Sequence, residues 1–147
     1  LDFPSRPAEP VAAPDTLAAA LGAEPVEVLA ARDFLCVFEK TEDVHNLRPD
    51  FAALARLGRA VIATAPGVGE FDFVSRFFAP SLGVDEDPVT GSAHCTLVPF
   101  WAERLGRSHL RAKQVSSRGG ELTCTLRGDR VVMSGRVAYY LEGWITI

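Results

Sequence analysis

The spacing of apolar residues predicts a chain built mainly of short strands, with a few helices between them. Alternating or continuous apolar runs rich in β-branched and aromatic residues are typical of strands, whereas apolar residues three or four positions apart are typical of helices. We therefore expect strands at residues 26–31, 34–39, 60–65, 71–78, 111–117, 122–127, 130–134 and 137–147. Short helices are expected at residues 15–21 and 48–57, ended by Gly22 and Gly58.

One longer helical pattern runs from Gly91 to Leu105, and Gly106 ends it. Its apolar residues form one broad stripe that comprises Ala93, Leu97, Phe100, Trp101 and Leu105. Pro99 lies within this pattern and predicts a kink or an exposed turn. A helix with so broad a stripe is expected to pack inside a curled sheet. The strands succeed one another as hairpins, so the predicted fold class is α+β, a mostly antiparallel sheet around a central helix at about residues 91–105.

Length and charge limit the kinds of protein that this chain can be. The 147 residues suit one domain, residues 1–147. The net charge is −4 and no block of Lys or Arg occurs, which disfavours nucleic acid and anionic membranes as partners. No apolar run reaches the roughly 18 residues of a membrane span. The first residues, Leu1 to Pro4, contain neither Met nor the pattern of a signal peptide, so we expect a cytoplasmic protein whose chain begins partway through a longer one.

The cysteines and histidines are too scattered to predict a metal site. Cys36, Cys95 and Cys124 are far apart, no CxxC occurs, and the three histidines are not clustered. Buried, reduced thiols are therefore expected. The larger aromatic residues are expected in the core rather than in a ligand site. These are Phe71, Phe73, Phe77, Phe78, Trp101 and Trp144.

The residues most suited to chemistry lie between 85 and 94, in the sequence DEDPVTGSAH. Three acids precede a Thr90-Gly91-Ser92 turn at a predicted helix start. Backbone N–H groups at a helix start, with nearby hydroxyls, can hold a carboxylate, and Gly91 allows close approach to the backbone. Asp87 can exchange protons or hold a substrate amine. The same residues are also ordinary helix-capping residues, so from the residues alone capping and ligand binding both remain open. Pro88 and the lack of further oxygen ligands disfavour calcium.

Several segments resemble the PhzF-like phenazine biosynthesis family. Residues 86–94, EDPVTGSAH, are similar to that family's signature, and residues 114–122, QVSSRGGEL, resemble its Q-x-S-x-R-G-G segment. Residues 132–143 resemble its closing strands, and Leu1 to Pro4 resemble its entry into a second lobe. The first of these blocks is long and specific, and the others support it.

The resemblance implies the diaminopimelate epimerase fold, in which two similar lobes enclose a cleft. It also implies an isomerase that works without metal or cofactor, of the kind that acts on trans-2,3-dihydro-3-hydroxyanthranilate in phenazine biosynthesis. By position, Asp87 matches an acid of the substrate pocket and is the expected catalytic residue. Gly91 and Ser92 match contacts to a carboxylate substrate, and Thr90 is a weaker match in the same turn.

The resemblance covers only the family's C-terminal half, because nothing here matches the first lobe that carries its principal catalytic Glu and a Gly-His segment. We therefore expect this chain alone to be inactive, with an N-terminal lobe or a partner chain completing the site and a homodimer as the assembly. An amino-acid epimerase or racemase, and a non-catalytic module that binds a small acid or assembles with a second copy, remain alternatives.

Three neighbouring residues have weaker expected roles. His94 is expected on the helix surface or behind the site, and Cys95 as a buried structural thiol. Arg118 is expected either to solvate its turn or to reach an anionic substrate.

Overall fold

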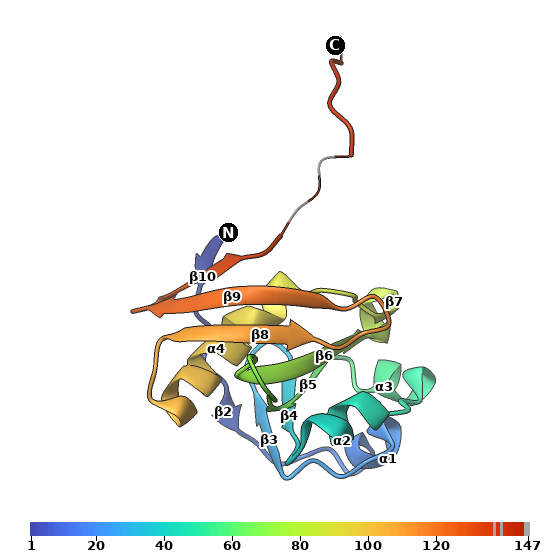
Figure 1. Ribbon diagram of the computed structural model, residues 1–147. Coiled ribbons are helices and arrows are strands. Elements are labelled where there is room, and N and C mark those ends of the chain that lie inside the picture. Colours follow the sequence, from blue (N-terminus) through green and yellow to red (C-terminus); the bar gives the residue numbers. More distant parts are fainter. Residues whose placement is uncertain (137, 139, 146–147) are drawn as a thin grey trace.

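A ten-stranded mixed sheet forms most of the molecule, and several helices pack against it (Figure 1). The computed structural model describes residues 1–136, 138 and 140–145. The strands are β1 (Asp2–Pro4), β2 (Glu9–Pro10), β3 (Glu27–Ala30), β4 (Phe34–Val37), β5 (Val61–Pro66), β6 (Phe73–Ala79), β7 (Val84–Glu86), β8 (His109–Gln114), β9 (Gly120–Arg127) and β10 (Arg130–Ser134). The helices are α1 (Leu17–Leu21), α2 (Thr41–Asn46), α3 (Phe51–Arg56) and α4 (Gly91–Leu105), and Pro80–Leu82 form one 3₁₀ turn, η1.

The strand order is β1-β10-β9-β8-β6-β5-β4-β3-β2, and β7 pairs with β6 outside this path. The pairs β4–β5 and β6–β8 are parallel, and the other pairs are antiparallel. The two strands at the ends of this order, β1 and β2, are joined in sequence by only residues 5–8. The sheet is therefore strongly curved, and these residues connect its two ends. The α+β fold class predicted from the hydrophobic pattern is confirmed.

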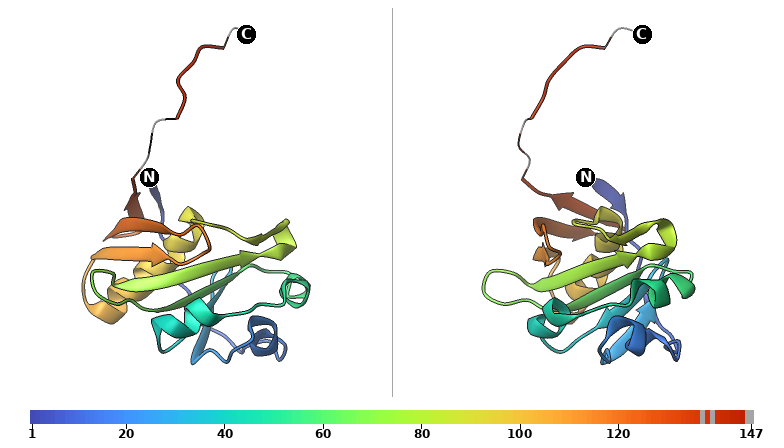
Figure 2. Two further views of the ribbon diagram at one scale, coloured as in Figure 1. Left: turned by 45° about the vertical axis from the view of Figure 1, so that its right-hand side comes forward. Right: turned by 90° about the vertical axis from the view of Figure 1, so that its right-hand side faces the viewer.

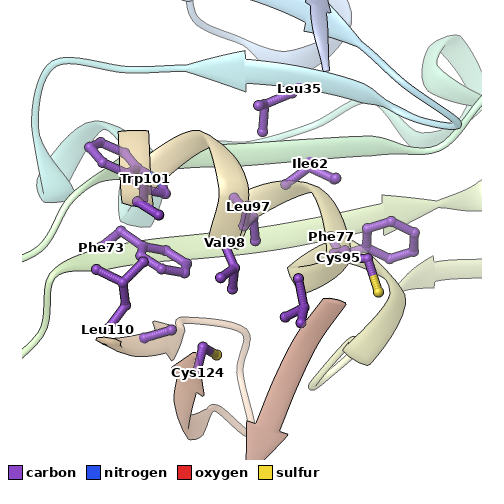
Figure 3. Packing of buried hydrophobic residues seen from close by; sticks show 14 of the residues in the cluster. Leu35, Ile62, Phe73, Phe77, Cys95, Leu97, Val98, Trp101, Leu110 and Cys124 are labelled. Carbon is purple, nitrogen blue, oxygen red and sulfur yellow. The ribbon is translucent and has the colours of Figure 1, made fainter. Parts of the chain in front are cut away.

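Helix α4 packs on the inner face of the curved sheet (Figures 1 and 3). Its buried residues share one apolar cluster with residues from β3 to β6 and from β8 to β10. Leu97 and Val98 are fully buried at the middle of this cluster, and Trp101 stacks on Phe73 with ring centroids 5.9 Å apart. The helix ends because Gly106 adopts the left-handed conformation, with φ of 65°.

Helices α1, α2 and α3 cover the opposite face of β4, β5 and β6 (Figure 2). A second apolar cluster joins Leu17 and Leu21 of α1 and Leu54 of α3 to the outward side chains of these strands. The side chain of Asp50 accepts a hydrogen bond from Ala53 N and caps α3, as expected for an acid at a helix start. The alternating side chains of each strand thus supply two apolar layers.

The predicted strand at residues 137–147 is wrong for the described part of that segment. Residues 138 and 140–145 have no regular secondary structure, and residues 137, 139, 146 and 147 lie outside the described residues. Trp144, expected in the core, is 99% exposed. A strand requires a partner with free backbone groups, and β10 already pairs on both sides, with β9 and with β1.

Other differences concern short elements. The pattern did not predict α2, β2 or β7, each of six residues or fewer. Such short segments hold few apolar positions, so their periodicity is weak. Where the structure describes the chain, it contains no helix that has both the length and the apolar character required of a membrane span.

Candidate functional site at the start of helix α4

The acidic segment predicted to carry chemistry forms a tight turn between β7 and α4. The three acids point to different partners. Glu86 forms a two-pronged ion pair with Arg76, at 2.7 and 2.9 Å, and Asp85 is exposed. Asp87 is half-buried, its N–H donates to Phe77 O, and its Oδ2 accepts a hydrogen bond of 2.5 Å from Thr90 Oγ1. Of the three acids, only Asp87 faces the helix start.

Thr90 precedes the first turn of α4 and is almost fully buried. Its side chain makes no capping hydrogen bond to the helix, because its hydroxyl is directed to Asp87. The first N–H groups of a helix have no acceptor within the helix and carry a partial positive charge. Thr90 therefore does not cap the helix with its side chain. The backbone N–H groups of the first turn stay available to another acceptor.

Gly91 and Ser92 are half-exposed at the same helix start. A Cβ atom added to Gly91 would meet no atom within 4 Å, so there is open space beside this part of the backbone. Ser92 Oγ accepts a hydrogen bond of 3.0 Å from Arg32 Nη2. The predicted residues Asp87, Thr90, Gly91 and Ser92 thus lie together around one partly open turn.

Arg32 is a residue of this site that was not predicted; it falls between the predicted strands at residues 26–31 and 34–39. It lies between β3 and β4, 60 positions from Ser92, and it also forms an ion pair of 2.7 Å with the buried Asp33. The hydrogen bonds that Arg32 donates to the Asp33 carboxylate raise the pKa of Arg32, so the guanidinium stays charged. The helix start therefore has a fixed positive charge beside its free N–H groups, and nothing in the local sequence around Arg32 indicates this position.

Gln114, at the end of β8, is the other residue that the analysis did not single out. It is fully buried and lies directly behind the turn. Its side-chain oxygen accepts from Thr90 N at 2.8 Å, and its Nε2 donates to Asp87 O at 2.6 Å and to Thr90 Oγ1 at 3.1 Å. The signal in the sequence was its place in the block 114–122, for which no structural role was inferred.

His94 is completely buried, so of its two expected positions the helix surface is excluded and the position behind the turn is the one observed. The ring packs beside Phe73, with centroids 6.0 Å apart, and its Nδ1 lies 2.7 Å from Thr90 O, an acceptor. Nδ1 therefore carries the proton. Burial lowers the pKa of His94 to about 4, so the ring is neutral at pH 7. Nε2 is buried and has no hydrogen-bond partner in the described residues. His94 thus supports the turn from inside the core.

The cysteines are buried, as predicted, and none forms a disulfide in the described residues. Burial raises the pKa of Cys36 and of Cys124 to about 12. Cys95 lies in the first turns of α4, and burial raises its thiol pKa despite the opposing effect of Arg6 and Arg32. A protonated thiol is a poor nucleophile, so this geometry fits a structural cysteine.

The last residue with an expected role, Arg118, lies beside the turn rather than in it. Arg118 is exposed and lines a groove of about 830 Å³ together with Val89, Gly120 and Met133. Among the residues described, no group of three or more His, Cys, Asp or Glu side chains is placed to hold a metal ion.

The fold and the turn define an α+β protein with a carboxylate held at the start of a helix that packs inside a curved sheet. Comparison with known sequences gives the family. The model of the phenazine biosynthesis-like (PhzC-PhzF) proteins matches residues 8–143. The chain belongs to this family.

Curated relatives agree with this assignment. A Pseudomonas aeruginosa protein named an uncharacterized isomerase is 54% identical over the whole chain, and a protein of the same description from Halalkalibacterium halodurans is 41% identical over 97% of it. The chain covers 57% and 55% of the lengths of these two relatives. It therefore spans little more than half of the curated proteins that it matches.

Solved structures show the same fold. A PhzF-family protein from Enterococcus faecalis is 44% identical with a TM-score of 0.88 and is matched over 92% of this chain and 52% of its own. A Clostridium difficile protein described as a putative phenazine biosynthesis PhzC/PhzF protein is 37% identical with a TM-score of 0.89, covering all of this chain and 57% of its own. Both curated relatives described above are named isomerases.

Proposed function

We propose that this chain is the substrate-binding half of a cofactor-independent isomerase that moves a proton on a small cyclic amino or hydroxy acid. The substrate class is that of trans-2,3-dihydro-3-hydroxyanthranilate. The strongest support is the turn at the start of α4, where Asp87 is held by Thr90 beside open space at Gly91. Relatives named isomerases also support a proposal of this kind.

In this proposal the helix start binds the substrate carboxylate. The N–H groups at Gly91 and Ser92 donate to the carboxylate oxygens, and the partial positive charge of the helix favours an anion there. Arg32, fixed by its ion pair with Asp33 and its hydrogen bond to Ser92, adds a charged guanidinium nearby, although the Asp33 carboxylate offsets part of its charge. The same donors stabilise the negative charge that spreads toward the carboxylate when a proton leaves an allylic carbon of the ring that is conjugated with it.

Asp87 then acts on the polar group of the substrate or on its proton. A carboxylate at the edge of this turn can hold an amine or hydroxyl, or serve as the secondary acid or base. The principal acid is proposed to be a glutamate of a first lobe, which has no counterpart among these residues. Closure of the two lobes excludes water and keeps the transferred proton within the site.

The proposal includes the arrangement of the whole protein. This chain forms the C-terminal lobe, an N-terminal lobe of the same protein faces the start of α4, and this chain alone does not turn over substrate. We further propose a cytoplasmic homodimer. The three buried free thiols of this chain fit a reducing compartment. The lengths of the relatives, almost twice that of this chain, fit a second lobe.

The test is turnover of trans-2,3-dihydro-3-hydroxyanthranilate by the full-length protein, followed by NMR. The change Asp87→Ala is expected to lower turnover at least about tenfold, on the usual size of acid–base effects. Asp85→Ala is the matched control, because Asp85 lies two residues away and is exposed. Equal turnover of wild type and Asp87→Ala contradicts the proposal.

A non-catalytic role in binding small acids is the second candidate, and the open helix start with Arg32 is what favours it. Anthranilate is a suitable probe, and calorimetry measures its binding. Binding that weakens with Arg32→Ala, together with no turnover by the full-length protein, selects this candidate over the isomerase.

A further inference from the structure

Residues 114–120, from the last residue of β8 to the first residue of β9, lie against the turn that carries Asp87. Sequence analysis singled out this segment without giving it a role. In the structure its residues contact the backbone or side chains of all four turn residues, 87–90. The two blocks are 24 or more residues apart in sequence, so this contact exists only in the folded protein.

Gln114 makes the central contacts, and the orientation of its side-chain amide follows from them. Its Oε1 accepts from the backbone N–H of Thr90, which can only donate. Its Nε2 donates to the backbone carbonyl of Asp87, which can only accept. Exchange of the two ends would place a donor against a donor and an acceptor against an acceptor. The amide therefore has one orientation.

This orientation sets the direction of the next hydrogen bond. Nε2 of Gln114 also lies 3.1 Å from Thr90 Oγ1, and because it is a donor the hydroxyl accepts from it. The single hydroxyl hydrogen of Thr90 is then free to point to Asp87 Oδ2, 2.5 Å away. Oδ2 of Asp87 is thus an acceptor, and Oδ1 is the oxygen that can take or give a proton to a substrate.

Two further residues hold the middle of the turn. Ser116 Oγ donates to Pro88 O at 2.8 Å and accepts from Gly119 N at 3.0 Å. At Gly120, an added Cβ would lie 2.2 Å from Cγ2 of Val89. Position 120 therefore has no room for a side chain, because the Val89 side chain occupies the adjacent space. The segment thus holds the turn by hydrogen bonds at Asp87, Pro88 and Thr90 and by packing at Val89.

We propose that Gln114 is a positioning residue that acts through Thr90. It directs the Thr90 hydroxyl to donate to Asp87 Oδ2, and this leaves Asp87 Oδ1 facing the substrate. This inference rests on the proposed function for its catalytic part, since it assumes that Asp87 acts on a substrate. Its structural part stands without that assumption. Gln114 itself is fully buried and does not contact the substrate.

The first experiment measures the turn independently of activity. Gln114→Met keeps the length of the side chain and removes its hydrogen bonds. In the full-length protein, the amide hydrogen of Thr90 is expected to exchange at least about tenfold faster in this variant, because its acceptor is lost. Ser75→Ala is the matched control, since Ser75 is buried opposite Gln114 in the sheet register and its hydroxyl has no partner in the described residues. Unchanged exchange at Thr90 in Gln114→Met overturns the inference.

The second experiment measures turnover of trans-2,3-dihydro-3-hydroxyanthranilate. We expect Gln114→Met to lower kcat at least about tenfold while KM stays within about threefold, because the substrate carboxylate still meets the helix start. Thr90→Val is a second variant, which retains the volume of the side chain and removes the hydroxyl. Since both changes act through the same hydroxyl, the double variant is expected to lose no more kcat than the worse single variant.

The outcomes separate the two proposals. If Asp87→Ala leaves turnover unchanged, the proposed function fails, whereas the exchange measurement at Thr90 still tests the structural part. If Asp87→Ala lowers kcat but Gln114→Met and Thr90→Val do not, the positioning role is overturned and the proposed function stands. Multiplicative effects of Gln114→Met and Thr90→Val also overturn it. If Gln114→Met does not fold, Thr90→Val alone decides on the same kcat and KM criteria.

Discussion

The two faces of the curved sheet bury different kinds of side chain. The outer face, under α1, α2 and α3, is apolar along β4, β5 and β6 except at Arg76, which pairs with Glu86. The fully buried polar residues of the described strands are Thr64, Ser75 and Gln114, and they occupy neighbouring register positions on the inner face, toward α4. Buried polar groups lower stability unless they are paired.

The buried polar residues show where the fold uses hydrogen bonds in place of apolar packing. Thr64 accepts from the indole of Trp101, and Gln114 holds the turn at Asp87, so each of these two polar groups ties α4 or its start to the sheet. On the outer face, apolar contacts hold α1 and α3, and Arg76 adds hydrogen bonds to Val44 O and Leu47 O at the end of α2. We therefore expect changes on the outer face to alter stability alone, and changes near the start of α4 to alter the site as well.

The largest expected effect is loss of packing on the outer face. Leu54→Ala removes a fully buried side chain of α3 and is expected to lower the free energy of unfolding by about 3 kcal/mol. Urea denaturation measures this change. The comparison of the two faces predicts that the NMR signals of Thr90 and Gly91 do not shift, and a shift of these signals would show that the outer face is coupled to the site.

A pH dependence of similar size is expected from His94 on the inner face. Burial lowers its pKa to about 4 in the folded protein, against about 6.5 in the unfolded chain. Between these values the unfolded chain binds more protons, so the free energy of unfolding is expected to fall by about 3 kcal/mol as pH decreases from 7 to 4.

The measurement compares wild type with His94→Gln by urea denaturation at pH 7 and pH 4. Both proteins contain the same carboxylates, which titrate in the same range. The contribution of His94 is therefore the difference between their two pH dependences. Equal dependence in the two proteins refutes the role given to its burial.

Gly120→Ala is expected to have a moderate effect that reaches the site. The new methyl group overlaps the Val89 side chain and is expected to cost about 2 kcal/mol. Val89→Ala removes the overlapping atoms, so the double variant Val89→Ala/Gly120→Ala is expected to be more stable than the sum of the two single changes predicts. Additive effects in thermal denaturation contradict direct contact as the cause.

The smallest effect is expected at the rim of the molecule. Glu27 and Arg104 form an ion pair between β3 and the last turn of α4, with side chains 33% and 42% exposed. Exposed pairs contribute little, so Glu27→Gln is expected to change the free energy of unfolding by less than about 1 kcal/mol. A larger loss would show that the last turn of α4 is held by charge, which contradicts the expectation that polar contacts fix only the start of this helix.

Much of the fold follows from local pattern. The alternation around Leu29 and Leu35 predicts the β3–β4 hairpin, and the broad apolar stripe with Gly106 predicts α4 with its correct ends. Short elements such as α2 were missed because six residues carry little periodicity. The apolar residues 140–145 were read as part of a strand because composition alone does not reveal whether a pairing partner is available.

The candidate site was predicted in part. The residues Asp87, Thr90, Gly91 and Ser92 are adjacent in sequence, and their motif indicated both a helix start and a family. Arg32 was missed because only the packing of the β3–β4 turn against α4 brings it to Ser92. For His94 the sequence left both the helix surface and a position behind the site open, because one residue at a helix start can face either solvent or core, and its neighbours in space decide which.

The sequence by itself determined the longer elements up to β10, the α+β class and the segment of the candidate site, because each depends on interactions among residues close together in the chain. The tertiary structure decided which of three adjacent acids faces the helix start, and it placed Gln114 and Arg32 beside that acid. Hydrogen bonds and ion pairs between residues 24 to 60 positions apart leave no periodic trace in the sequence. They form only when the curved sheet brings β8 and the β3–β4 turn to the same end of α4.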